Sequence, residues 1–251
     1  MKKKIAVVTG ATGGMGIEIV KDLSRDHIVY ALGRNPEHLA ALAEIEGVEP
    51  IESDIVKEVL EEGGVDKLKN LDHVDTLVHA AAVARDTTIE AGSVAEWHAH
   101  LDLNVIVPAE LSRQLLPALR AASGCVIYIN SGAGNGPHPG NTIYAASKHA
   151  LRGLADAFRK EEANNGIRVS TVSPGTTNAP SVVDLIVILV GGWLSWRMHT
   201  YRIGDDVRHR TWGEGVVTDL RGVGDKVEIT INFPTVGEKV LLLSWAPLEK
   251  M

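Results

Sequence analysis

The fold of the N-terminal part of the chain is decided by the stretch VVTGATGGMG, residues 7–16. An apolar run leads into it and a segment with helical periodicity follows it, so the glycines lie in a turn from a strand into a helix. Glycine permits a tight turn and lets a pyrophosphate approach the N-terminus of the helix. The alternative is a plain strand-to-helix loop, because a glycine-rich turn alone is weak evidence.

The pattern around this stretch repeats as far as residue 172: a short apolar run, a turn, then a segment whose apolar residues recur at three and four. Such alternation predicts a doubly wound α/β fold with a parallel sheet, in which ligands lie at the carboxyl ends of the strands. The expected strands are residues 5–10, 27–33, 47–53, 75–81, 125–131 and 167–173.

Composition narrows the class of protein. The chain has 251 residues, 45% hydrophobic and 23% charged, which suits one large globular domain with a smaller addition. A net charge of −7 makes nucleic acid an unfavoured partner. The single cysteine, Cys125, lies in an apolar run and is expected to be a buried hydrophobe. The apolar run after the N-terminal lysines is too short for a signal peptide, so we expect a cytoplasmic protein.

A pair of residues in a predicted helix indicates acid–base chemistry. Tyr144 and Lys148 are four residues apart and therefore share one helix face. A phenol is a poor base at neutral pH, but a nearby ammonium stabilises the phenolate and makes the tyrosine a usable general acid and base. Ser131 ends a predicted strand and is placed to hydrogen-bond the same substrate oxygen. Taken singly, each residue has a structural alternative.

With these residues, the sequence from about residue 3 to 180 resembles the short-chain dehydrogenase/reductase family. Four motifs carry the resemblance: TGATGGMG, Asn104 in LDLNVIVP, Ser131, and YAASK at residues 144–148. It implies that Tyr144 transfers a proton to or from the reacting oxygen, with Ser131 orienting that oxygen. It further implies that Lys148 also holds the nicotinamide ribose and that Asn104 fixes a water that relays protons to Lys148.

The resemblance also implies the residues that contact a nicotinamide dinucleotide. Asp54 resembles the aspartate that contacts adenine, and Pro174 and Gly175 match a turn beside the nicotinamide. At the end of the second strand an acidic residue would favour NAD, but Arg34 stands there and suits a 2′-phosphate, so NADP(H) is favoured over NAD(H). The full expected set is Thr9, Gly10, Thr12, Gly13, Gly14, Met15, Gly16, Arg34, Asp54, Ala81, Lys148, Pro174 and Gly175. No metal site is expected.

Three departures from the family pattern stand out. His79-Ala80-Ala81-Ala82 replaces the usual NNAG, which removes the asparagines that brace the central turn and leaves His79 as a packed residue rather than a catalyst. Ala179 replaces a threonine beside the nicotinamide, so we expect weaker cofactor affinity. The helical lid that normally selects the substrate is missing, because little chain separates the sixth strand from the next apolar run.

Residues 181–200 form an apolar junction. The longest uncharged apolar stretch, residues 185–196, is twelve residues long and contains two glycines, which is too short for a membrane span. Leu185 to Val190 suits an edge strand of the sheet, with Trp193 and Trp196 over apolar surface. The abrupt change of pattern is consistent with a gene fusion or a shifted reading frame, a hypothesis that resequencing tests.

Residues 201–251 predict a second domain, a small β-barrel of the SH3 or Tudor type. Short alternating runs are separated by glycine-rich turns every eight to twelve residues. The segment resembles the Tudor-like tail of PcrA/UvrD-type DNA helicases, which implies an interaction module. Seven basic and eight acidic residues from 199 to 251 favour a protein partner over nucleic acid.

The function expected from these patterns is an NADP(H)-dependent oxidoreductase that moves hydride to or from a carbonyl or alcohol carbon, with Tyr144 as the general acid and base. The alternative is a catalytically weak dinucleotide-binding protein whose C-terminal module mediates protein or nucleic-acid interaction. The substrate and a homo-oligomeric state stay open.

Overall fold

The computed structural model describes residues 3–174, 204–209, 211–221, 228–242 and 248–250. The chain divides into two compact units, Met1–Trp193 and Leu194–Met251. Within the described ranges, no helix is long and apolar enough to span a membrane, and no cluster of side chains is arranged to hold a metal ion.

The first unit is built on a sheet of six parallel strands in the order β3-β2-β1-β4-β5-β6. The order reverses between β1 and β4, which creates a crevice at their carboxyl ends, where ligands bind in folds of this kind. All six strands predicted from the sequence are present. Their bounds are β1 Lys4–Thr9, β2 His27–Gly33, β3 Val48–Glu52, β4 Thr76–His79, β5 Cys125–Ile129 and β6 Arg168–Val172.

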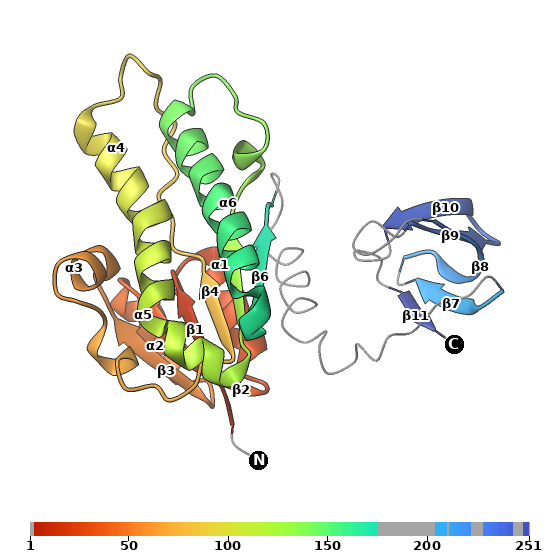
Figure 1. The fold of residues 1–251 in the computed structure, drawn as a ribbon, viewed down its shortest axis with the longest axis horizontal. Coiled ribbons are helices and arrows are strands. Elements are labelled where there is room, and N and C mark those ends of the chain that lie inside the picture. Colours follow the sequence, from red (N-terminus) through yellow and green to blue (C-terminus); the bar gives the residue numbers. More distant parts are fainter. Residues whose placement is uncertain (1–2, 175–203, 210, 222–227, 243–247, 251) are drawn as a thin grey trace. The chain divides into compact units, whose positions relative to one another are not determined.

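Helices cover both faces of this sheet (Figure 1). Alternate residues of β1 point to opposite faces: Val7 packs with α5 and α6, whereas Ala6 and Val8 pack with α1 and α2. The short helix α3 was not predicted, because six residues carry little periodicity. The helices are α1 Gly14–Leu23, α2 Pro36–Ala43, α3 Ile55–Leu60, α4 Val94–Leu101, α5 Val107–Ala122 and α6 Thr142–Glu162, with a π-helical turn, Asp102–Ile106, between α4 and α5.

The second unit contains an antiparallel sheet in the order β10-β9-β8-β7-β11. Four of its strands follow the predicted alternating runs, while β11 was not predicted. Its core residues are Val207, Val217, Ile229, Ile231 and Phe233. The closed barrel stays a prediction, since the described strands form an open order. The strands are β7 Asp206–His209, β8 Gly213–Arg221, β9 Glu228–Phe233, β10 Gly237–Leu242 and β11 Leu248–Lys250.

Several sequence predictions fall outside the described residues. They are the cofactor contact at Gly175, the substitution at Ala179, the missing lid, and the edge strand from Leu185 to Val190. The domain bounds 1–180, 181–200 and 201–251 likewise stay predictions.

Candidate active site

The turn after β1 is built so that only glycine fits at two positions. Gly10 has φ +68°, and a Cβ there would lie 2.6 Å from the backbone nitrogen of Ala81. A Cβ on Gly16 would collide with the carbonyl oxygen of Gly10. Helix α1 then begins with no side-chain cap and no acidic residue in its first turn. Its first N–H groups therefore stay available to an anion.

The central turn after β4 is braced from the neighbouring strand. The hydroxyl of Thr9 accepts hydrogen bonds from the backbone N–H groups of Ala80 and Ala81, each at 3.2 Å, and it lies 3.4 Å from the carbonyl oxygen of Val78. Thr9 is 1% exposed. The sequence HAAA at residues 79–82 has no asparagine to hold this turn, and the buried hydroxyl of Thr9 holds it instead.

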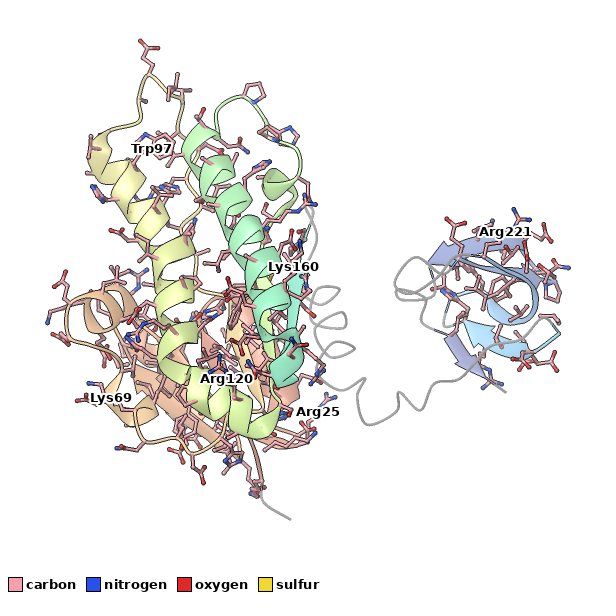
Figure 2. The ribbon with its side chains drawn as sticks, in the orientation of Figure 1. Arg25, Lys69, Trp97, Arg120, Lys160 and Arg221 are labelled. Atoms are coloured by element: carbon pink, nitrogen blue, oxygen red, sulfur yellow. The ribbon has the colours of Figure 1, made fainter. Side chains whose placement is uncertain are left out.

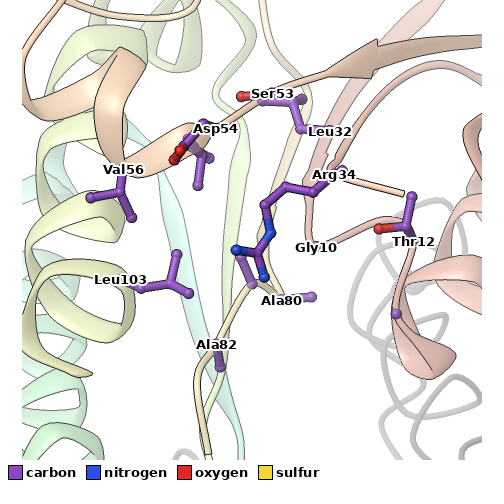
Figure 3. Close-up of a pocket in the computed structure, with 14 residues that line it drawn as sticks. Gly10, Thr12, Leu32, Arg34, Ser53, Asp54, Val56, Ala80, Ala82 and Leu103 are labelled. Carbon is purple, nitrogen blue, oxygen red and sulfur yellow. The ribbon is translucent and has the colours of Figure 1, made fainter. Parts of the chain in front are cut away.

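These two turns form one wall of a pocket of about 250 Å³ at the carboxyl ends of β1, β2, β3 and β4 (Figure 3). Of the residues predicted to bind a cofactor, six line it: Gly10, Thr12, Gly13, Arg34, Asp54 and Ala81. It is also lined by Leu32, Gly33, Ser53, Ile55, Val56, Ala80, Ala82 and Leu103.

Arg34 extends its guanidinium into this pocket (Figure 3). Arg34 does not cap α2, because the side chain of Asn35 does so by accepting from the N–H of His38. Within the described ranges no carboxylate forms a salt bridge with Arg34. Its charge is therefore available to an anionic ligand.

Two further groups in the pocket suit a polar ligand. Asp54 is exposed and caps α3 by accepting weakly from the N–H of Lys57 at 3.4 Å. Ser53 is 4% exposed, and its hydroxyl has no hydrogen-bond partner among the described residues. A buried hydroxyl without a partner is unfavourable until a ligand satisfies it. The pocket thus combines a glycine-rich anion site, a free guanidinium and an unsatisfied hydroxyl, which fits a phosphorylated nucleotide.

Tyr144 and Lys148 lie on one face of α6, as the spacing predicts. The Nζ atom of Lys148 is 5.7 Å from the centroid of the Tyr144 ring and donates to the carbonyl oxygen of Ile129 at 2.9 Å. Lys148 is 2% exposed, and burial lowers its pKa to about 8 because a low-dielectric environment disfavours the ammonium.

Ser131 follows β5 at the carboxyl-end edge of the sheet, where the pocket also lies, and it packs beside α6. Its hydroxyl caps the 3-10 turn Gly132–Gly134 by accepting from the N–H of Ala133 at 3.2 Å. The side chain of Asn130 holds the backbone of Ser131 against α6. The Oδ1 atom of Asn130 accepts from the N–H of Ser131, and its Nδ2 atom donates to the carbonyl oxygen of Lys148. Pro174 joins the same cluster by accepting at its carbonyl from the N–H of Gly132 at 3.0 Å.

Asn104 is buried in the π-helical turn, and its side chain links three segments. Its Oδ1 accepts from the N–H of Val83, and its Nδ2 donates to the carbonyl oxygen of Val83 and to the hydroxyl of Ser147, all at 2.9 Å. Asn104 therefore fastens the segment after β4 to α6. The four predicted catalytic residues therefore lie near the carboxyl ends of β4 and β5. Asn104 bonds the segment after β4, Ser131 follows β5, and Lys148, beside the ring of Tyr144, bonds the last residue of β5.

The model of the short chain dehydrogenase family matches residues 4–185. The chain belongs to this family. The C-terminal unit matches a different model, that of the PcrA/UvrD tudor domain, over residues 203–250. This short-chain dehydrogenase therefore carries a tudor-type segment after its dinucleotide-binding fold.

Known proteins similar to this short-chain dehydrogenase are oxidoreductases. An uncharacterized oxidoreductase of Staphylococcus saprophyticus is 32% identical over 193 residues, which cover 72% of this chain and 81% of that protein. A solved short-chain dehydrogenase/reductase from Corynebacterium glutamicum is 80% identical with a TM-score of 0.65, covering 75% of this chain and 92% of its own. A metagenomic short-chain oxidoreductase solved in complex with NADP is 30% identical with a TM-score of 0.66, covering 76% and 91%.

Two residues that the sequence singled out are structural in this short-chain dehydrogenase. His79 is 2% exposed, stacks on Tyr128 with centroids 4.9 Å apart, and bonds Ser112 at 2.9 Å. Burial lowers the pKa of His79 to about 3, so the ring is neutral. Cys125 is buried, and burial raises the pKa of its thiol to about 11, as expected of a small hydrophobe.

Sequence reasoning missed two residues of the site, Ser53 and Asn130. Both directly adjoin predicted site residues, namely Asp54 and Ser131, at the ends of strands. A polar residue buried at the carboxyl end of a parallel strand was the available signal. Only the structure showed that both belong to the site, through the hydrogen bonds of Asn130 and through the lack of a partner for the Ser53 hydroxyl among the described residues.

Proposed function

We propose that the first unit is an NADP(H)-dependent oxidoreductase that moves hydride between the nicotinamide and a carbonyl or alcohol carbon. The observation that carries this proposal is the burial of Lys148 beside the ring of Tyr144 on one face of α6. Burial of a lysine ammonium without an ion-pair partner opposes folding, so a catalytic role is a reason for its presence at this position. Next to a phenol, that charge stabilises the phenolate.

The chain's own residues handle the proton. During reduction, the hydroxyl of Tyr144 donates its proton to the carbonyl oxygen, and the hydroxyl of Ser131 hydrogen-bonds the same oxygen. In oxidation the Tyr144 oxygen takes the proton back. The nicotinamide, when bound, supplies or accepts the hydride. Lys148 holds the nicotinamide ribose and stabilises the charge on Tyr144, and Asn104 fixes a water that returns the proton to Lys148.

The pocket supports NADP(H) over NAD(H). The guanidinium of Arg34 suits a 2′-phosphate dianion, and it is Arg34, not an acidic residue, that directly follows β2. The N–H groups of Gly14, Met15 and Gly16 at the start of α1 suit the pyrophosphate. Asp54 and Ser53, which line the pocket, suit the adenine and ribose hydroxyls. Pro174, whose carbonyl accepts from the N–H of Gly132, suits the nicotinamide end, and the predicted contact at Gly175 lies outside the described residues.

A second function is supported by the match of residues 203–250 to the PcrA/UvrD tudor model. In that case the first unit is a weak catalyst that mainly binds the dinucleotide, and the C-terminal unit recruits a partner. The nearly balanced charge of residues 199–251, seven basic against eight acidic, favours a protein over a nucleic acid. A pull-down that compares the full chain with one ending at residue 198 tests this function.

The deciding experiment is a fluorescence titration with NADPH and NADH, followed by assays of ketone reduction with Tyr144→Phe. Saturable binding of NADPH and loss of turnover in the variant support the oxidoreductase. Absence of binding to either nucleotide contradicts both functions proposed for the first unit. Binding with unchanged turnover in Tyr144→Phe would exclude the assigned role of the tyrosine.

A further inference from the structure

A buried histidine adjoins Tyr144 and takes no part in the chemistry proposed above. His100 on α4 is 0% exposed, and its ring lies edge-on to the Tyr144 ring, with centroids 6.5 Å apart at an angle of 66°. Its Nε2 atom is buried and has no hydrogen-bond partner in the part of the chain that the structure describes. A buried polar atom without a partner is rare and opposes folding, so a histidine at this position calls for a reason other than stability.

A hydrogen bond at Nδ1 holds the ring of His100 in place. Its Nδ1 lies 2.8 Å from the backbone carbonyl oxygen of Glu96, which can only accept, so Nδ1 carries the proton and the neutral ring has a bare Nε2. The carboxylate of Glu96 lies 3.8 Å from the same Nδ1 and is itself held by Arg85 at 2.8 Å. Two oxygens thus attract one N–H group and restrict rotation of the imidazole.

The distance between His100 and Tyr144 is fixed one turn further along, between the π-helical turn that follows α4 and helix α6. Asn104, four residues after His100, donates to the hydroxyl of Ser147 at 2.9 Å. That hydroxyl in turn donates to the carbonyl oxygen of Tyr144 at 2.7 Å. In the view of Figure 2, Trp97 lies on the side of α4 toward α6, on the turn before His100. The two helices are therefore joined around the contact between the rings.

Tyr144 lies in the first turn of α6, so its ring depends on contacts from outside the helix, such as the one with His100, to hold its position. The N-cap residue, Asn141, forms no side-chain capping bond, and the half-buried Tyr144 ring lies close to Lys148 on its own helix. The backbone of this turn is held by Thr142, whose N–H donates to the carbonyl oxygen of Thr87 at 3.1 Å. The ring itself is bounded by His100 from the neighbouring helix.

We propose that His100 is a positioning residue for Tyr144: its anchored ring keeps the phenol beside Lys148 in the orientation that proton transfer requires. This inference rests on the proposed function, in which Tyr144 is the acid and base. Misorientation of a catalytic group lowers turnover far more than it lowers cofactor binding, since the group meets only the reacting atoms.

The test compares three substitutions. His100→Ala removes the ring, His100→Phe keeps a ring without nitrogens, and His98→Ala on the same helix, where the side chain is 71% exposed, serves as the matched control. For each variant we would measure kcat and KM for reduction of small ketones, the NADPH dissociation constant, and the NMR signals of 13C-labelled tyrosine rings. The chain has four tyrosines, and the signal that disappears in Tyr144→Phe identifies Tyr144. His100→Leu replaces the alanine variant if the latter does not fold.

We expect His100→Ala to lower kcat about tenfold or more, to leave the NADPH dissociation constant within about twofold, and to shift the Tyr144 ring signals. His100→Phe keeps the ring but loses the hydrogen bond of Nδ1 to the carbonyl oxygen of Glu96, so it should recover only part of kcat and of the wild-type ring signals. His98→Ala should change nothing. Unchanged kcat and unchanged ring signals in His100→Ala would overturn the positioning role, as would a phenylalanine variant as impaired as the alanine variant. If Tyr144→Phe keeps full turnover, it is instead the proposed function that fails.

Discussion

The ammonium of Lys148 lies 5.7 Å from the centre of the Tyr144 ring and is held there by a hydrogen bond to the carbonyl oxygen of Ile129. The lysine side chain is thus fixed at the end of β5 although its charge is almost wholly buried. Because Lys148 is buried, its protonation can be measured through the dependence of the free energy of unfolding on pH.

We predict that the free energy of unfolding rises between about pH 8 and pH 10.5 because of Lys148. Burial lowers its pKa from 10.5 to about 8, so in this window the unfolded chain binds the proton that the folded chain has lost, and stability increases with pH. The full change is on the order of 3 kcal/mol. Chemical denaturation of the wild type and of Lys148→Met measures it, with the exposed Lys69→Met as control. Equal slopes in wild type and Lys148→Met would contradict the lowered pKa.

Arg34 is predicted to select the phosphorylated dinucleotide. Because its guanidinium extends into the pocket without a carboxylate partner among the described residues, Arg34→Ala should weaken NADPH binding by about tenfold to a hundredfold and leave NADH binding nearly unchanged. Fluorescence titration with both nucleotides measures the effect. Arg25→Ala, at an exposed arginine paired with Asp22, is the control. Equal losses for both nucleotides would show that Arg34 does not read the 2′-phosphate.

Ser53 is predicted to contact the nucleotide. Its buried hydroxyl has no partner in the part of the chain that the structure describes, so Ser53→Ala should leave stability unchanged or raise it slightly while weakening NADPH binding about fivefold to tenfold. Calorimetric titration and thermal unfolding of the same samples separate the two effects. Thr171→Val removes another unsatisfied buried hydroxyl that does not line the pocket, and it should leave affinity intact. Lower affinity in both variants would point to a general loosening of the fold.

Gly10 and Gly14 form a matched pair of turn glycines. Gly10→Ala is expected to destabilise the protein by about 1–3 kcal/mol, since φ is +68° and a Cβ would meet the backbone of Ala81 at 2.6 Å. A Cβ on Gly14 meets no atom of the described residues within 4 Å, so Gly14→Ala should keep wild-type stability. Urea denaturation of both variants measures this difference. Similar stabilities would mean that the turn relaxes to accept a side chain.

Much of this protein was predictable from local sequence. The six parallel strands, the glycine-rich turn and the shared face of Tyr144 and Lys148 all follow from short-range patterns, because strand burial, turn geometry and helical spacing depend on residues close in the chain. The same holds for four strands of the second unit. The short helix α3 and strand β11 were missed, since segments of six and three residues carry too little periodicity.

The sequence by itself determined which groups are present: a phosphate-binding turn, a tyrosine with its lysine, a serine, and an arginine in place of an acid. Only the tertiary structure decided their surroundings, which residues distant in sequence create. Thr9 braces the turn that lacks asparagines, the hydroxyl of Ser53 finds no partner among the described residues, and the ring of His100 on α4 meets the ring of Tyr144 on α6. Burial and hydrogen-bond satisfaction are properties of the packed chain, and no spacing along the sequence encodes them directly.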